Sequence, residues 1–488
     1  MGVLSNLEPK NVFYFFEEIC KIPHGSGNVG QISDYLVEFA KQRNLYYKQD
    51  EVKNVIIIKE ATKGYEDQPA MILQGHMDMV AVKKPDCDID MKTEGLRLAI
   101  DGDKIYAMGT SLGGDDGIAV AYGLALLDAD DIPHPRLEVV ITVDEEVGLN
   151  GAKAIDLSGL KANRMLNLDS EEEGIFWTSC AGGARVDCVL PVKRIQMQGV
   201  AVKLSVEGLL GGHSGAEIHK ERGNSNALMG RILWAVSQQM KIGICELQGG
   251  LADNAIPRQT KALLVVEEKD QATFKDVIAM EGAAIAGELA SKDPGFQVFL
   301  SEAEESVNAS GMYHCVAGEE VARCAAFLTA LPNGVQAMSA DVEGLVETSL
   351  NMGLLSLKED GLHAGFAVRS SVESAKYALI AKLQAVTSLA GGSNAVTGDY
   401  PGWQYRVDSP LRDKMIKIYR EMYGRDPKVE AIHAGLECGI LGSKIPDLDC
   451  VSLGPDMKDI HTTEETLSIS STKRVWEYLV RLLGEKES

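Results

Sequence analysis

The feature that most constrains this chain is a series of short apolar segments, most of which lead into acidic or histidine residues. Four of these segments have the length of buried strands and lie at residues 54–58, 70–74, 137–143 and 164–168. Helical stretches lie among them, and 117–127 is the most apolar. Strands that alternate with helices predict an α/β domain, with a mostly parallel mixed sheet flanked by helices.

A different pattern begins near Cys188, where strand-like segments such as 346–357 and 362–369 flank an expected helix at 226–240. The α/β pattern returns after Tyr400-Pro401-Gly402-Trp403. A chain of 488 residues is too long for one ordinary core. We therefore expect a discontinuous core domain, residues 1–187 and 402–488, with an inserted α+β domain at residues 188–401.

Charge and targeting signals narrow the classes of partner. The net charge of -23 argues against nucleic acid or an anionic membrane surface as the partner. The N-terminus lacks the pattern of a signal peptide, and the longest apolar run is too short to span a bilayer. Nine scattered cysteines without a CxxC pair are typical of reduced thiols. We expect a cytoplasmic protein that binds neither nucleic acid nor membranes.

Three acidic or histidine motifs follow directly after expected strands. His76 and Asp78 come after the strand at 70–74, Glu145 and Glu146 after the strand at 137–143, and Asp169 after the strand at 164–168. Each motif alone is more often a turn or a solvated acidic run. Because open α/β sheets place ligand sites at the carboxyl ends of their strands, their joint occurrence indicates a site.

Two further motifs complete the set. Asp115 lies in the glycine-rich turn 113–117 before the expected helix. Taken alone, an aspartate at this position is most simply interpreted as a helix N-cap. His461 follows an expected strand at 450–453, and Thr462 with Glu465 matches a capping box for the final helix. Two histidines with several carboxylates favour zinc, manganese or cobalt over calcium. An aspartate that bridges two ions would make a two-metal hydrolytic site.

The sequence resembles the zinc metallopeptidases that include the aminoacyl-histidine dipeptidases, and the resemblance extends nearly from end to end. The motifs that carry it are Gln74-Gly75-His76-Met77-Asp78-Met79-Val80, the Gly113–Gly117 turn, Asp144-Glu145-Glu146, Asp169-Ser170-Glu171-Glu172-Glu173-Gly174, Gly211-Gly212-His213-Ser214-Gly215, Asn254-Ala255-Ile256-Pro257-Arg258, Tyr400-Pro401-Gly402-Trp403-Gln404 and His433-Ala434-Gly435-Leu436-Glu437-Cys438-Gly439.

The resemblance implies a role for each motif residue. The site would hold two divalent ions, expected to be zinc, with cobalt or manganese as alternatives. Asp115 would bridge the two ions. His76 and Asp169 would bind one ion, and Glu146 and His461 would bind the other. Glu145 would be the general base acting on the metal-bridging water, and Asp78 would support His76. A cis peptide after the bridging aspartate, here Asp115-Asp116, is also expected.

The resemblance further implies that the inserted domain is a lid. His213 would stabilise the oxyanion of the reaction. Arg369 is our candidate for binding the substrate α-carboxylate, because a guanidinium matches that group with two hydrogen bonds. Asn254 and His433 are further candidate substrate contacts.

These observations predict a metal-dependent dipeptidase that hydrolyses unblocked dipeptides, including Xaa-His dipeptides such as carnosine. A homodimer is compatible with the sequence. The alternatives are an N-acyl amino acid deacylase or a tripeptide aminopeptidase on the same scaffold. A metal-binding relative without turnover would lack Glu145 or a ligand residue, and this chain has them all. If the protein were purely structural, the occurrence of these motifs at the strand ends would be a coincidence.

Overall fold

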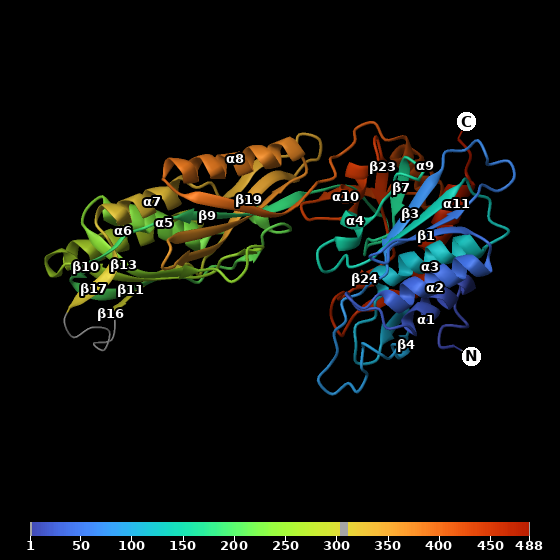
Figure 1. The fold of residues 1–488 in the computed structure, drawn as a ribbon, viewed down its shortest axis with the longest axis horizontal. Helices are drawn as coiled ribbons and strands as arrows, with labels where there is room; N and C mark the ends of the chain where they lie inside the picture. Colours follow the sequence, from blue (N-terminus) through green and yellow to red (C-terminus); the bar gives the residue numbers. More distant parts are fainter. Residues whose placement is uncertain (1, 303–310, 488) are drawn as a thin grey trace. The chain divides into compact units, whose positions relative to one another are not determined.

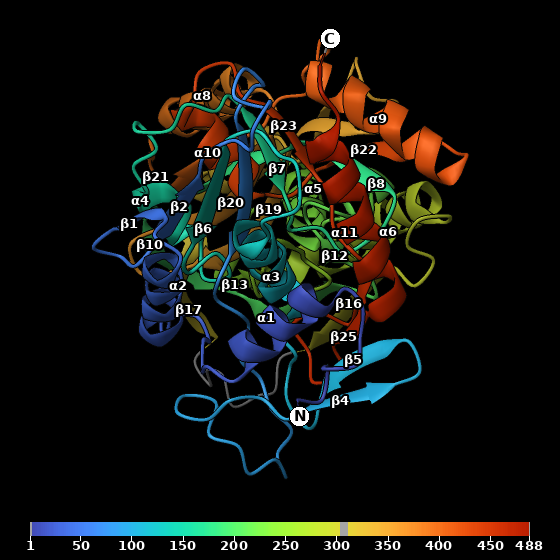
Figure 2. The same cartoon turned by 90° about the vertical axis from the view of Figure 1, so that its right-hand side faces the viewer.

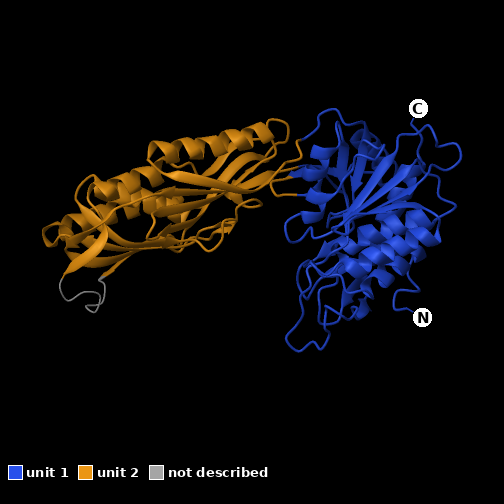
Figure 3. Cartoon of the chain, in the orientation of Figure 1, with its two compact units in different colours: residues 1–179, 405–431, 436–488 blue, residues 180–404, 432–435 orange. Residues whose placement is uncertain are grey.

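The computed structural model, which describes residues 2–302 and 311–487, divides into two units (Figure 3). Unit 1 comprises residues 1–179, 405–431 and 436–488, and unit 2 comprises residues 180–404 and 432–435. The boundary that the sequence suggested between residues 187 and 188 falls inside strand β9 (Gly182–Leu190). Because β9 pairs along its length with β20 (Leu362–Ser370), the whole strand belongs to unit 2.

Unit 1 is built on an eight-stranded mixed sheet in the order β1-β2-β6-β3-β7-β23-β8-β22. The four central strands, β6, β3, β7 and β23, run parallel, and every residue of β3 and β6 is buried. Helices cover the centre of such a sheet on both faces, which is why β3 and β6 are buried along their whole length. The strands are β1 (Tyr46–Gln49), β2 (Val55–Lys59), β3 (Met71–His76), β6 (Leu137–Thr142), β7 (Arg164–Asn167), β8 (Ile175–Cys180), β22 (Lys428–Ile432) and β23 (Asp449–Ser452).

The helices of unit 1 form two layers. Helix α3 packs on α1 and joins α11 through the stacked rings of Tyr122 and Trp476, and α11 meets α9 through Tyr478 and Tyr419. Helices α4 and α10 pack together on the other side of the sheet (Figures 1 and 2). The helices are α1 (Lys10–Cys20), α2 (Gly30–Gln42), α3 (Gly114–Asp128), α4 (Asn150–Ala154), α9 (Pro410–Tyr423), α10 (Glu437–Lys444) and α11 (Ile469–Gly484).

A small four-stranded sheet completes unit 1 in the order β24-β25-β5-β4. Its strands are β4 (Leu98–Asp101), β5 (Lys104–Ala107), β24 (Met457–Lys458) and β25 (Thr466–Ser468). The segment between β24 and β25 carries His461 and Glu465, two residues of the site described below.

Unit 2 contains an eleven-stranded sheet whose pairs are antiparallel. Helices α5 to α8 cover one face (Figure 1), and their apolar residues pack on alternate residues of the strands. The other elements are β10 (Arg194–Gln198), β11 (Val200–Glu207), β12 (Gly212–His213), α5 (Ser225–Ser237), β13 (Ile242–Gly249), β14 (Ala255–Ile256), β15 (Thr260–Val266), α6 (Gln271–Leu289), β16 (Gln297–Glu302), β17 (Met312–Ala317), α7 (Glu319–Ala330), β18 (Gly334–Met338), β19 (Val346–Leu357), α8 (Glu373–Leu389) and β21 (Ser393–Tyr400).

The expected α/β fold class is confirmed. Strand β19 has the bounds predicted at 346–357, and β20 ends one residue beyond the predicted 362–369. The helix expected at 226–240 is α5, which begins where the Asn224 side chain accepts hydrogen bonds from the N–H groups of Asn226 and Ala227. Among the described residues, the helices are too short or too polar to cross a membrane.

The packing of unit 2 gives a first testable prediction. Phe366 of β20 is 1% exposed within the core, whereas Phe299 of β16 is 47% exposed. Phe366→Ala leaves a cavity and should lower the free energy of unfolding by about 3–5 kcal/mol. Phe299→Ala, the matched control, should change it by about 0.5 kcal/mol or less. Denaturant unfolding of both variants measures this, and similar losses in the two would contradict the assigned core.

Candidate metal centre

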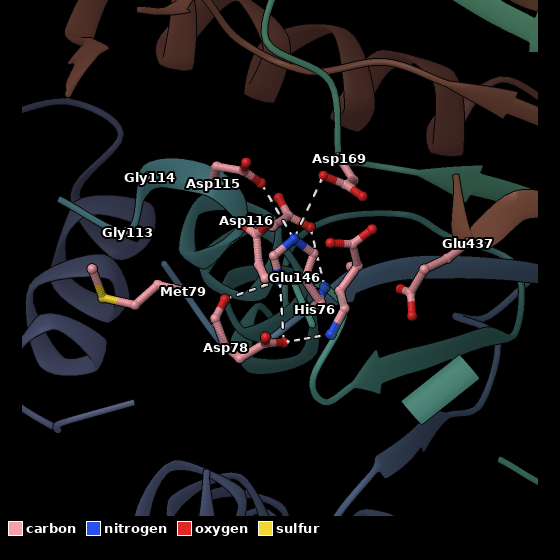
Figure 4. Close-up of polar contacts among 12 residues, drawn as sticks. His76, Asp78, Met79, Gly113, Gly114, Asp115, Asp116, Glu146, Asp169 and Glu437 are labelled. Carbon is pink, nitrogen blue, oxygen red and sulfur yellow. Dashed lines mark hydrogen bonds and ion pairs between the residues drawn. The ribbon is translucent and has the colours of Figure 1, made fainter. Parts of the chain in front are cut away.

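The ends of three parallel strands bring the predicted residues together at one edge of the unit 1 sheet (Figure 4). His76 is the last residue of β3, and Glu145 and Glu146 lie in the turn after β6. Asp169 follows β7, which pairs with β3 in parallel. Because the carboxyl ends of neighbouring parallel strands share an edge, side chains far apart in the sequence meet there.

Asp115 reaches the same place from the first turn of α3. Asp115 and Asp116 have non-helical backbone angles, and the peptide bond between them is cis, as the resemblance implied. Among possible ligand sets in the described chain, two contain His76 and a third joins Asp115, Glu146 and His461. The metal residues proposed from the sequence therefore lie in one cluster.

The two histidines approach different oxygens of Asp115. His76 Nε2 lies 3.3 Å from Asp115 Oδ1, and His461 Nε2 lies 3.1 Å from Asp115 Oδ2. His76 Nε2 is also 3.7 Å from Asp169 Oδ1, and His461 Nε2 is 2.8 Å from Glu146 Oε1. Asp115 is thus shared by two groups, each with one imidazole and one further carboxylate, which is the arrangement needed to bridge a pair of cations.

Asp78 fixes the orientation of His76. The carbonyl oxygen of Asp78 lies 2.9 Å from His76 Nδ1, so Nδ1 carries the proton and Nε2 keeps a free lone pair that could bind a metal ion. The Asp78 carboxylate accepts hydrogen bonds from the Glu145 backbone N–H at 3.1 Å and from Ser26 Oγ at 2.8 Å. Asp78 therefore connects His76, at the end of β3, to the candidate base Glu145, in the turn after β6.

The acidic groups fit a pair of divalent cations. Burial is the largest cause that raises the pKa of Glu145 to about 9 and that of Asp169 to about 6, and neighbouring carboxylates add to both shifts. The buried atoms Asp115 Oδ1 and Asp116 Oδ1 accept no hydrogen bond from the described residues. Bound cations would favour the charged carboxylates and satisfy these oxygens, and the nitrogen and oxygen donors suit zinc, manganese or cobalt.

Glu465 holds the loop that carries Asp115, a role that the sequence motifs did not indicate. Its carboxylate accepts hydrogen bonds from four consecutive backbone N–H groups, those of residues 112–115, at 2.8–3.4 Å. The predicted capping box of Thr462 and Glu465 is therefore wrong. Helix α11 begins at Ile469, and Ser468 caps it by accepting from the Ser471 N–H.

Glu437 is a second acidic residue of the site that the sequence did not single out. It is fully buried, and its Oε2 accepts from Gln74 Nε2 at 2.5 Å and from Thr142 Oγ1 at 2.6 Å. Burial raises the pKa of Glu437 to about 7, and the charge of Asp169 adds to this shift. Its position as the first residue of α10 offers no local signal for this role.

Three of the four remaining candidate residues, His213, Arg369 and His433, lie close together within unit 2. A Cβ added to Gly215 would lie 2.6 Å from the His433 carbonyl oxygen, 3.0 Å from His213 Cε1 and 3.2 Å from Arg369 Nε. Arg369 Nη1 donates to the Tyr400 hydroxyl at 3.4 Å, while Arg369 Nε is buried without a hydrogen-bond partner among the described residues. This cationic group suits an anionic ligand.

His213 is held with a defined donor. Its Nδ1 accepts the N–H groups of Gly215 and Ala216 at 3.2 and 3.1 Å, so the neutral ring carries its proton on Nε2. Burial, with the charge of Arg369, lowers the pKa of His213, which favours this neutral form. Asn254 lies beside it, because its carbonyl oxygen accepts the Ser214 N–H at 2.8 Å.

The Glu465 contacts give a second prediction. In Glu465→Gln, the amide NH2 group faces backbone donors, so the loop of Asp115 loses its anchor and metal affinity should fall about 10- to 100-fold. The matched control is Glu464→Gln, because Glu464 is exposed and pairs with Lys84 at the surface. Calorimetric titration with Zn²⁺ measures both variants. Equal affinity in Glu465→Gln and the wild type would show that Asp115 is positioned without Glu465.

Known proteins are similar to this chain over nearly its whole length. The sequence model of peptidase family M20/M25/M40 matches residues 72–485. The cytosol non-specific dipeptidase of Escherichia coli strain K12 is 34% identical over 487 residues, covering 99% of each chain. The crystal structure of an aminoacylhistidine dipeptidase from Vibrio alginolyticus also shows 34% identity, with a TM-score of 0.94 and 99% of each chain covered. Aminopeptidase PepT from Bacillus cereus shares the fold, with a TM-score of 0.54 and 15% identity over 98% of each chain. The resemblance inferred from the motifs is thereby confirmed, and the chain belongs to peptidase family M20/M25/M40 and is a hydrolase.

Proposed function

We propose that this protein is a metal-dependent dipeptidase that cleaves the peptide bond of unblocked dipeptides, Xaa-His dipeptides such as carnosine included. The observation that carries the proposal is the sharing of Asp115 between two groups, one with His76 and one with His461. Identity of 34% over nearly the whole length to two dipeptidases supports the choice of substrate. Zinc is the proposed metal, with cobalt and manganese as the alternatives.

Each residue of the cluster has a proposed part in binding the metals. Asp115 would bridge two ions, with His76 and Asp169 on one and Glu146 and His461 on the other. Two bound divalent cations would activate water and polarise the scissile carbonyl. Asp78 would keep His76 in the tautomer that leaves Nε2 free, through the carbonyl contact at Nδ1.

Glu145 is the proposed general base. Its backbone N–H is held by Asp78, which fixes the turn after β6. The carboxylate would take a proton from the attacking water and pass it to the leaving amine, so one residue serves both half-steps. A buried base of this kind needs neighbouring positive charge to ionise near neutral pH, because burial raises its pKa.

The residues of unit 2 supply the proposed substrate contacts. The Nε2–H of His213 is suited to donate to the developing oxyanion, because its Nδ1 is already occupied by backbone donors. Arg369, whose Nε is buried without a partner among the described residues, would bind the α-carboxylate of the dipeptide. Asn254 and His433 would line the same subsite, and unit 2 as a whole would act as the lid.

The cellular setting belongs to the same proposal. All nine cysteines are free thiols, which is typical of a reducing compartment, so we propose that the enzyme works in the cytoplasm. A homodimer is compatible with this function. An N-acyl amino acid deacylase would share the metal centre but would not require a free α-amine on its substrate, and a tripeptide aminopeptidase would accept a longer chain.

A substrate panel tests the proposal. The metal-loaded wild type should hydrolyse free dipeptides such as β-Ala-His, Gly-His and Leu-Leu, and should leave a tripeptide and an N-acetyl amino acid intact. Glu145→Gln should lower kcat by about 10²- to 10⁴-fold with two metals still bound, because only the proton transfer is lost. The control Glu172→Gln changes an exposed carboxylate and should keep full activity.

The alternatives give different outcomes in the same assay. Cleavage of the acetylated substrate alone would make the protein a deacylase, and cleavage of the tripeptide alone would make it a tripeptidase. Full activity in Glu145→Gln would remove Glu145 from the mechanism while leaving the substrate class standing.

A further inference from the structure

Two cysteines of unit 2 lie in neighbouring antiparallel strands and in one apolar cluster. Strands β13 and β17 pair Gly243 with Ala317 and Ile244 with Val316, and Cys245 and Cys315 are the residues that follow at the end of this ladder. Cys245 lies at an irregularity of β13, where the register of that strand with β15 shifts between Ile244 and Glu246. Cys245 packs against the small apolar cluster that contains Cys315 and Val265. Neighbouring strands of a sheet lie about 4.7–4.9 Å apart, a separation that a disulfide can span.

The pair lies on the face of the sheet that the helices leave uncovered. Successive side chains of a strand point to opposite faces of the sheet. Val316, the residue after Cys315 in β17, packs into the core under the helices. Cys315 is therefore directed to the opposite face, where it is buried beneath Met197 and Tyr313. Cys245 is only half-buried, so a small solute reaches the pair from its side.

Positive charge favours the thiolate at this pair. The Arg194 Nη1 atom donates to the Cys245 carbonyl oxygen at 3.0 Å, and Arg194 Nε is buried without a hydrogen-bond partner among the described residues. The hydrogen bond from Cys245 is the main cause that lowers the pKa of Cys315, and the positive charge of Arg194 lowers it further. Burial acts in the opposite direction. Reactive cysteines are found in such electropositive, partly accessible surroundings.

The other seven cysteines lack this combination. Cys438 and Cys450 interact with each other, but both are buried in unit 1. Cys87 is partly exposed, but it has no other cysteine beside it among the contacts of the described residues. Within the described chain, only Cys245 and Cys315 combine solvent access to one thiol, a second thiol in the same cluster and a nearby guanidinium group.

We propose that Cys245 and Cys315 form an oxidisable dithiol, a modification site that closes to an intramolecular disulfide when the protein meets a peroxide. The Cys315 thiolate attacks one peroxide oxygen, which breaks the O–O bond and gives a sulfenic acid and hydroxide. The Cys245 sulfur then attacks the Cys315 sulfur, and the sulfenic oxygen leaves as water. Overall, two thiols and one hydrogen peroxide give one disulfide and two waters, and two electrons pass from the thiols to the peroxide.

The bond would join strands that are separated in the sequence by β14, β15, α6 and β16. A cross-link between such distant positions restricts the unfolded chain, so oxidation is expected to stabilise unit 2. The site lies in unit 2 outside the residues proposed for catalysis, and the inference does not depend on the dipeptidase activity.

Mass spectrometry of the metal-loaded full-length protein tests the inference. The wild type and the variants Cys245→Ser, Cys315→Ser and Cys87→Ser are treated with hydrogen peroxide, quenched, denatured and alkylated. In the wild type and Cys87→Ser, the intact mass before alkylation should fall by two hydrogen atoms, two fewer thiols should be alkylated, and a peptide joining Cys245 to Cys315 should appear. In Cys245→Ser, dimedone should trap a sulfenic acid at Cys315, and the Cys315→Ser variant should keep all its thiols.

Two further readouts separate a reactive pair from a merely structural one. Oxidation should raise the melting temperature of the wild type by several degrees and leave that of the serine variants unchanged. Before oxidation, both serine variants should hydrolyse dipeptides with the wild-type kcat. Absence of the linked peptide in folded wild type, with Cys87 oxidised in the same sample, would overturn the proposal, as would oxidation of Cys315 to a sulfinic acid without cross-linking.

Discussion

Four backbone N–H groups that point at one carboxylate determine the geometry of the candidate metal centre. Glu465 receives the N–H groups of residues 112–115 and so fixes the loop on which Asp115 stands. A carboxylate that bridges two ions must present each oxygen to a different partner, and a loop free to rotate would lose that arrangement. The histidines at the two oxygens of Asp115, His76 and His461, meet there because this loop is held in place.

The same centre concentrates negative charge where water is scarce. Asp78, Asp115, Asp116 and Glu437 are all at least nine-tenths buried, and Glu145 and Asp169 have pKa values raised chiefly by burial. Burying unpaired carboxylates is costly, so a fold that gathers them needs a compensating charge. Divalent cations would supply that charge and, at the same time, the chemistry of a hydrolase. Stability of unit 1 and activity are therefore expected to depend on the same ions.

Sequence reasoning succeeded where local pattern and topology agree. Strand segments such as 346–357 are apolar enough to be identified, and the meeting of His76 and Asp169 at one edge of the sheet follows from their place after parallel strands. Glu465 was assigned to the wrong partner, because the spacing Thr462-x-x-Glu465 fits a helix cap locally while the loop that it holds lies some 350 residues earlier in the chain. Glu437 was not found, since only tertiary packing brings it to Gln74 and Thr142.

The most direct test of the account is the number of metal ions bound by variants of two ligands. Elemental analysis and calorimetric titration with Zn²⁺ would compare the wild type with Asp115→Ala and Asp169→Ala. The account predicts two ions in the wild type, one ion retained in Asp169→Ala, and loss of both tight sites in Asp115→Ala, because Asp115 alone is shared. Two ions bound tightly by Asp115→Ala would contradict a bridging role for Asp115 and with it the proposed centre.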